Sequence, residues 1–244
     1  MKCRNCTRGR FLIVVVLASV LYFHDDLKQI ISTPEVTIKE SYIDGKKESS
    51  TIRYYPNGEI RNKGNIKNSN KDGDWVWYFD NGQLKEEGNY KNGKSEGAWV
   101  WYHKNGQLRE KGNYKNGKSE GAWVWYHKNG QLQFKGNYKN DKRGGTVENY
   151  HDNGQINSKG NYTNGTMDGD WVDYWSNGQL SYKGNYKNGE EEGAWVFYHS
   201  NGQLRRKGNY KNGKKEGAWV YYKTDGSINK YSSGTFKNGK KTSN

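Results

Sequence analysis

An Asn-Gly pair recurs every 24 residues along most of the chain, and this period limits the possible folds more than any other feature. Asn-Gly is the strongest short signal for a β-hairpin turn, because both residues tolerate the positive φ angles of that turn. A second series lies between the members of the first, so each period is expected to hold two strands and two turns. The first series is Asn57-Gly58, Asn81-Gly82, Asn105-Gly106, Asn129-Gly130, Asn153-Gly154, Asn177-Gly178, Asn201-Gly202 and Asp225-Gly226, and the second is Asn92-Gly93, Asn116-Gly117, Asn164-Gly165, Asn188-Gly189 and Asn212-Gly213.

The repeat predicts an all-β fold, an elongated antiparallel meander of tandem two-stranded units. The repeat domain is expected over residues 36–244, as eight units and a C-terminal half unit, or seventeen strands in all. The first and last parts depart from the pattern, as the terminal caps of repeat arrays do. The units begin at Val36, Ile60, Leu84, Leu108, Leu132, Ile156, Leu180 and Leu204, and the half unit begins at Ile228.

The composition is polar but rich in aromatic residues. Only 31% of the residues are hydrophobic, yet 15% are aromatic and 32 are Gly. Disordered chains are poor in aromatic residues, whereas half-buried sheets favour them, so a thin sheet is expected rather than a thick core. The formal net charge is +14, but Lys recurs among Glu without a dense Arg cluster. This pattern indicates a solvated repeat surface and does not favour nucleic acid as a partner.

We assume that every turn has two residues. The turns then determine which side chains lie opposite one another and share a face of the sheet. Across the turn at Asn116-Gly117, Glu110 is then expected to lie opposite Trp123. The Gly, Trp and Tyr positions of every unit fall on one face, where a Trp ring laid across a strand Gly covers its bare backbone. We predict a structural role for these positions. They are Leu84, Gly88, Tyr90, Trp99, Leu108, Gly112, Tyr114, Trp123, Trp171, Trp195 and Trp219.

One column on the same face varies between units. Two residues after the first Trp of each unit, it reads Trp77, Trp101, Trp125, Asn149, Asp173, Phe197 and Tyr221. Large apolar patches usually mark an interface, so its aromatic members are candidate partner-binding residues: Trp77, Trp101, Trp125, Phe197 and Tyr221. The unit from Leu132 is irregular, with Asp141 for Gly and Val147 for Trp, which fits a bend, a boundary between two surfaces, or plain drift.

The N-terminus has the pattern of an export signal. Residues 1–10 form a basic region, residues 11–23 are apolar, and residues 24–35 are expected to form a linker. The apolar segment predicts one N-terminal helix. Basic residues stay on the cytoplasmic side, so the repeats are expected outside the cytoplasm. We favour an uncleaved signal anchor in the membrane over a cleaved signal peptide, because Ala18-Ser19-Val20 is a poor cleavage site; cleavage would make the protein exported.

No enzyme motif or cofactor site is expected. His103, His127, His151 and His199 share one column, but equivalent positions are two strands apart, roughly 9.5 Å. Zinc needs nitrogen ligands at about 2.1 Å, so a metal ladder is not favoured. Cys3 and Cys6 make half a zinc site at best. No nucleophile elbow, P-loop or dinucleotide fingerprint occurs, so a non-enzymatic protein without cofactors is predicted.

The repeat resembles the MORN-variant repeats of bacterial YwqK-like antitoxin proteins. The resemblance rests on strings such as GNYKNGKSEGAWVWYHKNGQL from Gly88 to Leu108, and it covers nearly everything after Val36. It implies a scaffold fold and, for function, an antitoxin-like inhibitor of a cognate toxin. The export signal departs from an antitoxin that acts in the cytoplasm.

Three partner classes are favoured over a fourth, a lipid surface bound through Lys and Tyr, because outer leaflets give basic residues less to bind. The first is a protein partner, or a second copy, bound through the aromatic face. The second is the toxin that the resemblance implies. The third is a cell-wall glycan, because aromatic rings stack on sugars and can also surround quaternary ammonium groups.

Overall fold

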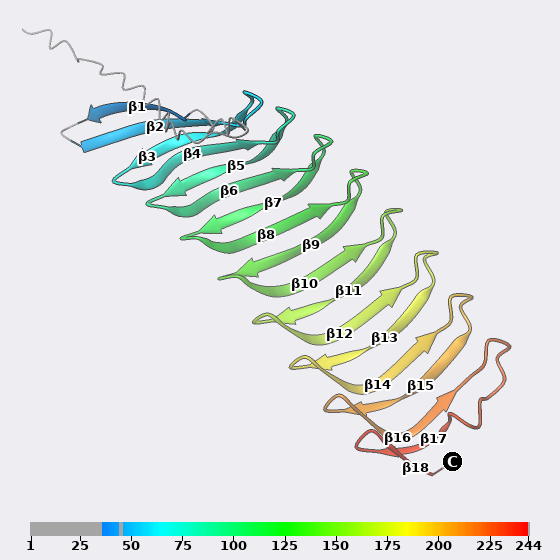
Figure 1. Ribbon diagram of the computed structural model, residues 1–244. Helices are drawn as coiled ribbons and strands as arrows, with labels where there is room; N and C mark the ends of the chain where they lie inside the picture. Colours follow the sequence, from blue (N-terminus) through cyan, green and yellow to red (C-terminus); the bar gives the residue numbers. More distant parts are fainter. Residues whose placement is uncertain (1–35, 44–45, 244) are drawn as a thin grey trace, which may run out of the picture. The chain divides into compact units, whose positions relative to one another are not determined.

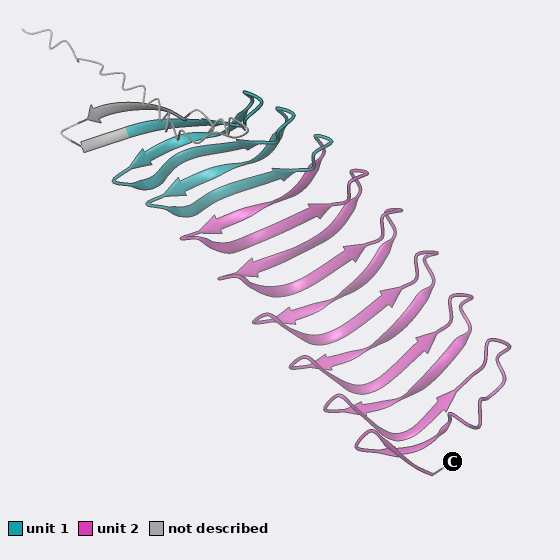
Figure 2. Ribbon diagram, viewed as in Figure 1, with its two compact units in different colours: residues 1–106 teal, residues 107–244 magenta. Residues whose placement is uncertain are grey.

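The computed structural model describes residues 36–43 and 46–243, with side chains described from residue 49 onward. These residues contain eighteen β-strands and no helix (Figure 1). Within them, no helix is long and apolar enough to cross a membrane. The basic region, the predicted helix over residues 11–23 and the linker lie outside the described residues. The chain divides into two compact units, unit 1 over residues 1–106 and unit 2 over residues 107–244 (Figure 2).

Unit 1 is an antiparallel meander in which each strand pairs with the next. Its 24-residue repeats each contribute two strands, as the sequence predicts. The strands are β1 (Val36–Ile43), β2 (Lys46–Tyr54), β3 (Ile60–Lys67), β4 (Asn70–Tyr78), β5 (Leu84–Lys91) and β6 (Lys94–Tyr102).

Unit 2 continues the same pattern within its own residues, again with every strand antiparallel to the next. The all-β antiparallel meander is therefore confirmed, with one terminal strand more than the sequence predicts. The strands are β7 (Leu108–Lys115), β8 (Lys118–Tyr126), β9 (Leu132–Lys139), β10 (Lys142–Tyr150), β11 (Ile156–Thr163), β12 (Thr166–Tyr174), β13 (Leu180–Lys187), β14 (Glu190–Tyr198), β15 (Leu204–Lys211), β16 (Lys214–Tyr221), β17 (Gly234–Lys237) and β18 (Lys240–Ser243).

The two series of Asn-Gly turns have different geometry. In the second series both central residues have positive φ, as at Asn92 (51°) and Gly93 (78°), which is the expected two-residue hairpin turn. In the first series only the Gly does, as at Gly82 (80°), and the loop is longer: the Phe79 N–H donates to the Gln83 carbonyl at 2.7 Å. The assumption of two-residue turns is thus correct for one series and wrong for the other.

A bulge inside every repeat from β3–β4 to β15–β16 also changes the pairing. Between β7 and β8, Tyr114 lies opposite Ser119, but Glu110 lies opposite Trp125 rather than Trp123. The predicted pair is therefore wrong by two residues, and the irregularity lies near Gly121, whose φ is +71°. A shift of one residue would turn every side chain to the other face, whereas a shift of two leaves the faces unchanged. The predicted assignment of side chains to the two faces is therefore correct even though the predicted pairs are not.

The core of each unit is a row of indole rings on one face of the sheet, here called the Trp face. In unit 1, Trp99 is only 3% exposed, and in unit 2, Trp195 is 2% exposed. Each ring lies flat on the Gly of the preceding strand. A Cβ on Gly88 would stand 2.2 Å from the Trp99 ring, and one on Gly184 equally close to Trp195, so no larger residue fits there without a shift.

The irregular repeat keeps its pairing by a substitution in the core. Val147 replaces the indole and is fully buried, but it is too small to cover the strand Gly alone. Phe134 on the same face covers the rest of this Gly. Its ring stands 2.8 Å from where a Cβ on Gly136 would be. Strands β9, β10 and β11 pair in sequence through this repeat, and the division between compact units falls at Gly106 rather than here.

Candidate binding face

Three columns of the Trp face vary from repeat to repeat, whereas its Gly, Trp and Tyr columns are nearly constant. The first variable column lies on the first strand of each repeat, and the other two lie on the second strand. We call the three together the variable strip. Its first column is Asn62, Glu86, Glu110, Phe134, Ser158, Tyr182 and Arg206; its second is Trp77, Trp101, Trp125, Asn149, Asp173, Phe197 and Tyr221; its third is Lys71, Ser95, Ser119, Arg143, Met167, Glu191 and Lys215.

The second column contains the predicted partner-binding residues, and the structure shows how far they are covered. Trp101 is 8% exposed and therefore largely buried. Trp77, Trp125, Phe197 and Tyr221 are half-buried. Trp125 stacks on Phe134 with ring centroids 4.2 Å apart. These rings pack against neighbouring rings of the Trp face and also border solvent. Each therefore has a structural contact in addition to its exposed surface.

Lys71 in unit 1 places its ammonium against three aromatic rings. Its Nζ lies 4.6 Å from the ring centroids of Trp75 and Trp77 and 4.8 Å from that of Tyr90. A cation within about 6 Å of a ring face is attracted by the negative face of the π-system. Burial lowers the pKa of Lys71. The chain thus uses its own lysine to fill an aromatic box.

Lys215 in unit 2 occupies the equivalent place in its own repeat. Its Nζ lies between 5.1 and 5.3 Å from the ring centroids of Trp219, Tyr221 and Phe236. The same position thus carries an ammonium in two repeats, one in each compact unit.

Arg143 also lies over aromatic rings, two of them in its own repeat and one, Trp125, in the preceding repeat. Its guanidinium stands 5.0 Å from the Phe134 ring and 5.8 Å from the Trp125 ring, and its Nε donates a hydrogen bond to the Tyr138 hydroxyl at 3.0 Å. Arg206 of the first column covers Phe197 at 4.0 Å. Cations held over rings are therefore a recurring feature of the variable strip.

A polar row crosses the Trp face in the middle of unit 2. Asn149 donates from Nδ2 to the Ser158 hydroxyl at 2.8 Å, and Ser158 pairs with Asp173, which in turn pairs with Tyr182. Burial raises the pKa of Asp173, although a hydrogen bond from Tyr182 opposes the shift. A half-buried carboxylate therefore replaces the aromatic side chain that the second column carries elsewhere.

Only the second variable column was predicted from the sequence; the other two were not. Their members alternate with residues of the opposite face, so the strand period already placed them beside the candidate residues. The signal lay in their variation: the third column changes from lysine to serine, arginine, methionine and glutamate, while its Tyr neighbours stay constant except for Ile66.

Members of the histidine column contact backbone carbonyl groups of the protein itself. His127 Nε2 lies 2.9 Å from the Tyr150 carbonyl oxygen, and His151 Nε2 lies 3.0 Å from the Tyr174 carbonyl oxygen, each one repeat further along. These contacts join neighbouring loops along the edge of the sheet. In the part of the chain that the structure describes, no group of acidic, His or Cys side chains is arranged to hold a metal ion.

The opposite face, here called the Val face, carries an ion-pair cluster in the irregular repeat. Glu148 stands where other repeats have Val, and it pairs with Lys135 at 2.6 Å and with Lys159 at 3.0 Å. Hydrogen bonds from Lys135 and then from Tyr150 lower the pKa of Glu148 to about 2. The cluster spans β9, β10 and β11, and it stabilises the local pairing.

Strand pairs of 24 residues, a Gly under each Trp and a meander topology define a class of β-hairpin repeat proteins. Comparison with family models identifies the MORN repeat variant in seven successive segments, and the chain belongs to this family of repeat scaffolds. Comparison with curated proteins finds no match. The matched segments are residues 47–68, 71–92, 95–116, 119–140, 143–164, 167–188 and 191–212.

Proposed function

We propose that this protein is a non-enzymatic scaffold, anchored in or exported across a membrane, that binds a protein partner through the variable strip. The observation that carries the proposal is that three columns of varying side chains lie beside the constant Trp and Gly columns on the Trp face. Within each compact unit, a constant core lies beneath a changing surface, as in repeat proteins that bind through their repeated surface.

The strip offers chemistry for a polypeptide rather than for a sugar. Sugar binding needs an open aromatic face, but the Trp column is buried, with Trp75 4% and Trp219 1% exposed. Cations already cover several of the outer rings, among them Trp77 under Lys71 and Phe197 under Arg206. Alternating charged, polar and aromatic positions suit side chains of a protein partner.

Site-specific photo-crosslinking in intact cells tests which face is used. A benzophenone amino acid at Met167 places the probe on the Trp face, and the same probe at Lys183 serves as the control on the Val face. We expect an adduct of one defined mass from the first position and none from the second. Equal labelling from both positions contradicts binding through the strip.

The proposed compartment has its own test. Protease added to intact cells or spheroplasts is expected to digest the repeats while a cytoplasmic marker survives, and the undigested chain is expected in the membrane fraction. Repeats that are protected until the cells are lysed would instead place the scaffold in the cytoplasm, where the antitoxin-like alternative applies.

A further inference from the structure

The positive charge of the repeats is concentrated in the last four strands. Residues 204–243 contain eleven Lys or Arg residues and only two carboxylates, Glu216 and Asp225, for a net charge of +9. Residues 36–203 contain 24 basic and 21 acidic residues, for a net charge of +3. The C-terminal part of unit 2 is therefore the strongly basic region of the repeat domain.

Six of these basic side chains lie on the Val face, and all six are exposed. Within the residues that the structure describes, no ion pair involves any of them. Glu216, the only carboxylate on β15–β18, is half-buried and accepts a hydrogen bond from the Asn238 backbone N–H at 2.9 Å. We call the six side chains the basic patch: Arg205, Lys207, Lys211, Lys214, Lys237 and Lys240.

The basic side chains on the Trp face of the same strands already have contacts within the protein. Arg206 lies over Phe197 at 4.0 Å, and Lys215 lies over the rings of its own repeat. Lys241 donates a hydrogen bond from Nζ to the Tyr231 carbonyl oxygen at 2.7 Å. The positive charge that is open to a ligand therefore lies on the Val face.

Four lysines of the basic patch form two pairs of like charge. Lys211 lies opposite Lys214 across the β15–β16 turn, and Lys237 lies opposite Lys240 across the β17–β18 turn. Like charges directly opposite one another destabilise a strand pair. The fold does not require them, because the β11–β12 hairpin has Thr at both equivalent positions. A bound anion would offset the repulsion between the paired lysines.

The two lysine pairs are held side by side by the backbone. The Gly239 N–H in the β17–β18 turn donates to the Lys215 carbonyl oxygen on β16 at 2.9 Å. A Cβ on Gly239 would lie 3.9 Å from the Lys214 Cβ. The bases of all four lysine side chains are therefore fixed along one edge of the sheet, so an anion meets a preformed group of ammonium charges.

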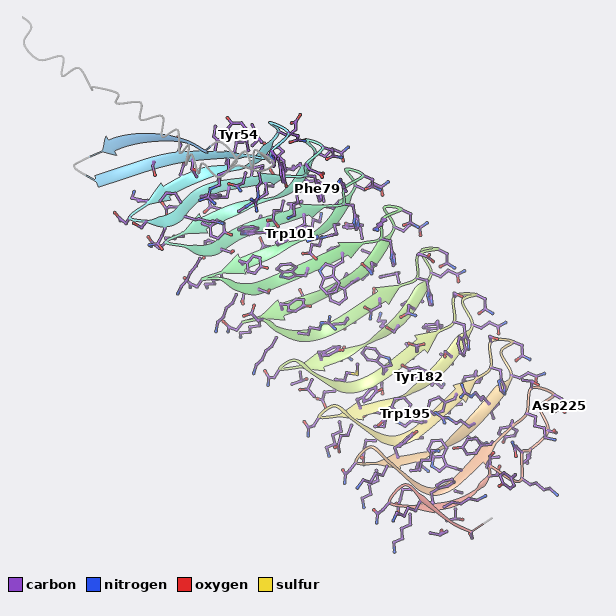
Figure 3. The ribbon with its side chains drawn as sticks, in the orientation of Figure 1. Tyr54, Phe79, Trp101, Tyr182, Trp195 and Asp225 are labelled. Carbon is purple, nitrogen blue, oxygen red and sulfur yellow. The ribbon has the colours of Figure 1, made fainter. Side chains whose placement is uncertain are left out.

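The surroundings of the lysine pairs suit a ligand that carries charge and little else. The turns between the paired lysines are Asn-Gly, so they offer no aromatic ring on which a nucleobase could stack. The exposed Ile228 and Tyr231 lie in the loop between β16 and β17, at the other end of these strands, where Figure 3 labels Asp225. A bilayer against the lysine pairs would therefore lack apolar side chains to enter it. Lysine binds phosphate as a point charge and needs no second kind of contact.

We propose that the basic patch binds linear inorganic polyphosphate, whose successive phosphate groups meet the two lysine pairs together. This inference goes beyond the proposed function, because it assigns a second ligand to the face opposite the variable strip. Lys on an edge strand also discourages aggregation, which accounts for Lys240 on β18. It does not account for Lys207, Lys211 and Lys214, because β15 and β16 are paired on both sides.

Fluorescence anisotropy of labelled polyphosphate tests the binding, with the full chain in a non-ionic detergent and at several NaCl concentrations. We expect saturable binding that inorganic phosphate at the same phosphorus concentration does not displace, because only a polymer meets several lysines at once. The affinity is expected to fall steeply as the salt concentration rises.

Two double variants of equal charge separate the basic patch from the net charge of the chain. Lys211→Gln with Lys214→Gln is expected to weaken binding about three- to ten-fold. It should also lower the slope of log Kd against the logarithm of the salt concentration by about 1.5. Lys223→Gln with Lys230→Gln removes the same charge from the exposed loop at the other end of the strands and is expected to change neither quantity.

A third variant extends the basic patch instead of reducing it. Glu190 lies opposite Lys187 in the neighbouring β13–β14 hairpin, so Glu190→Lys creates another lysine pair there. We expect the affinity to rise about three-fold. Asp152→Lys makes the same change of charge in an exposed loop at the other edge of the sheet and is expected to leave the affinity unchanged.

Equal losses in the two double variants, or equal gains in the two lysine substitutions, overturn the inference. Tighter binding of single-stranded DNA or of phosphatidylglycerol vesicles than of polyphosphate, at equal phosphate concentration, overturns it as well. Each of these results leaves the scaffold proposal standing, because that proposal depends on crosslinking from the Trp face.

Discussion

Two repeats of unit 2 solve the same packing problem in different ways. On β13 and β14, the Trp195 ring lies flat on Gly184, with a hypothetical Cβ only 2.2 Å from the indole. On β9 and β10, Val147 and Phe134 share the task over Gly136. The difference shows that the fold requires a covered strand glycine and accepts more than one cover, provided that the ring comes from the same face.

Truncating the side chain that covers the strand Gly should have the largest effect on stability. The loss should be greater in the regular repeat than in the irregular one. Trp195→Ala deletes a fully buried indole and should lower the local free energy of unfolding by about 3–5 kcal/mol, whereas Val147→Ala should cost about 2 kcal/mol. Native-state hydrogen exchange of the amides on β13–β14 and β9–β10 measures the two costs separately. Equal costs at the two sites would show that the indole adds nothing beyond its smaller replacement.

Replacing the covered strand Gly with Ala should have the next largest effect on stability. Gly184→Ala forces a methyl group against the rigid Trp195 ring and should cost about 3 kcal/mol, while Gly136→Ala meets the end of Phe134 at 2.8 Å and should cost about 1 kcal/mol. The same exchange measurement compares them. A larger cost at Gly136 would mean that Phe134 is the less adaptable cover.

These comparisons also show what the sequence could predict. The Asn-Gly period, the meander and the Trp–Gly face follow from strand alternation and turn chemistry, and they do not depend on exact register. The two-residue shift near Gly121 could not be read from the sequence, because the Gly has the same residue type whether it sits in a regular strand or in a bulge with φ of +71°. The third variable column was equally readable, but its meaning needed the ring distances around Lys71.

The energetic coupling between positions 147 and 134, whose side chains share the space over Gly136, should be smaller than these stability losses. Val147→Trp alone should destabilise β9–β10 by about 1–3 kcal/mol, because Phe134 already occupies the space over Gly136. Adding Phe134→Ser, the residue type found at position 158 of the next repeat, should recover part of this loss. A double-mutant cycle is expected to give a coupling energy of about 1–2 kcal/mol. Additive costs would show that the two side chains do not compete.

The smallest expected effect is acid sensitivity confined to the irregular repeat. Glu148 has a pKa of about 2, below its ordinary value of 4.5, so it stabilises the folded state above about pH 4.5 and loses this contribution as the pH falls toward 2. Its lysine partners are half-exposed, so solvent screening keeps the contribution below about 1 kcal/mol. Glu148→Val restores the residue found in the other repeats and should remove the acid-dependent loss at β9–β11 while leaving β13–β14 unchanged. Exchange measured between pH 5 and 2.5 tests this, and an unaltered pH dependence in the variant would assign the acid response to other carboxylates.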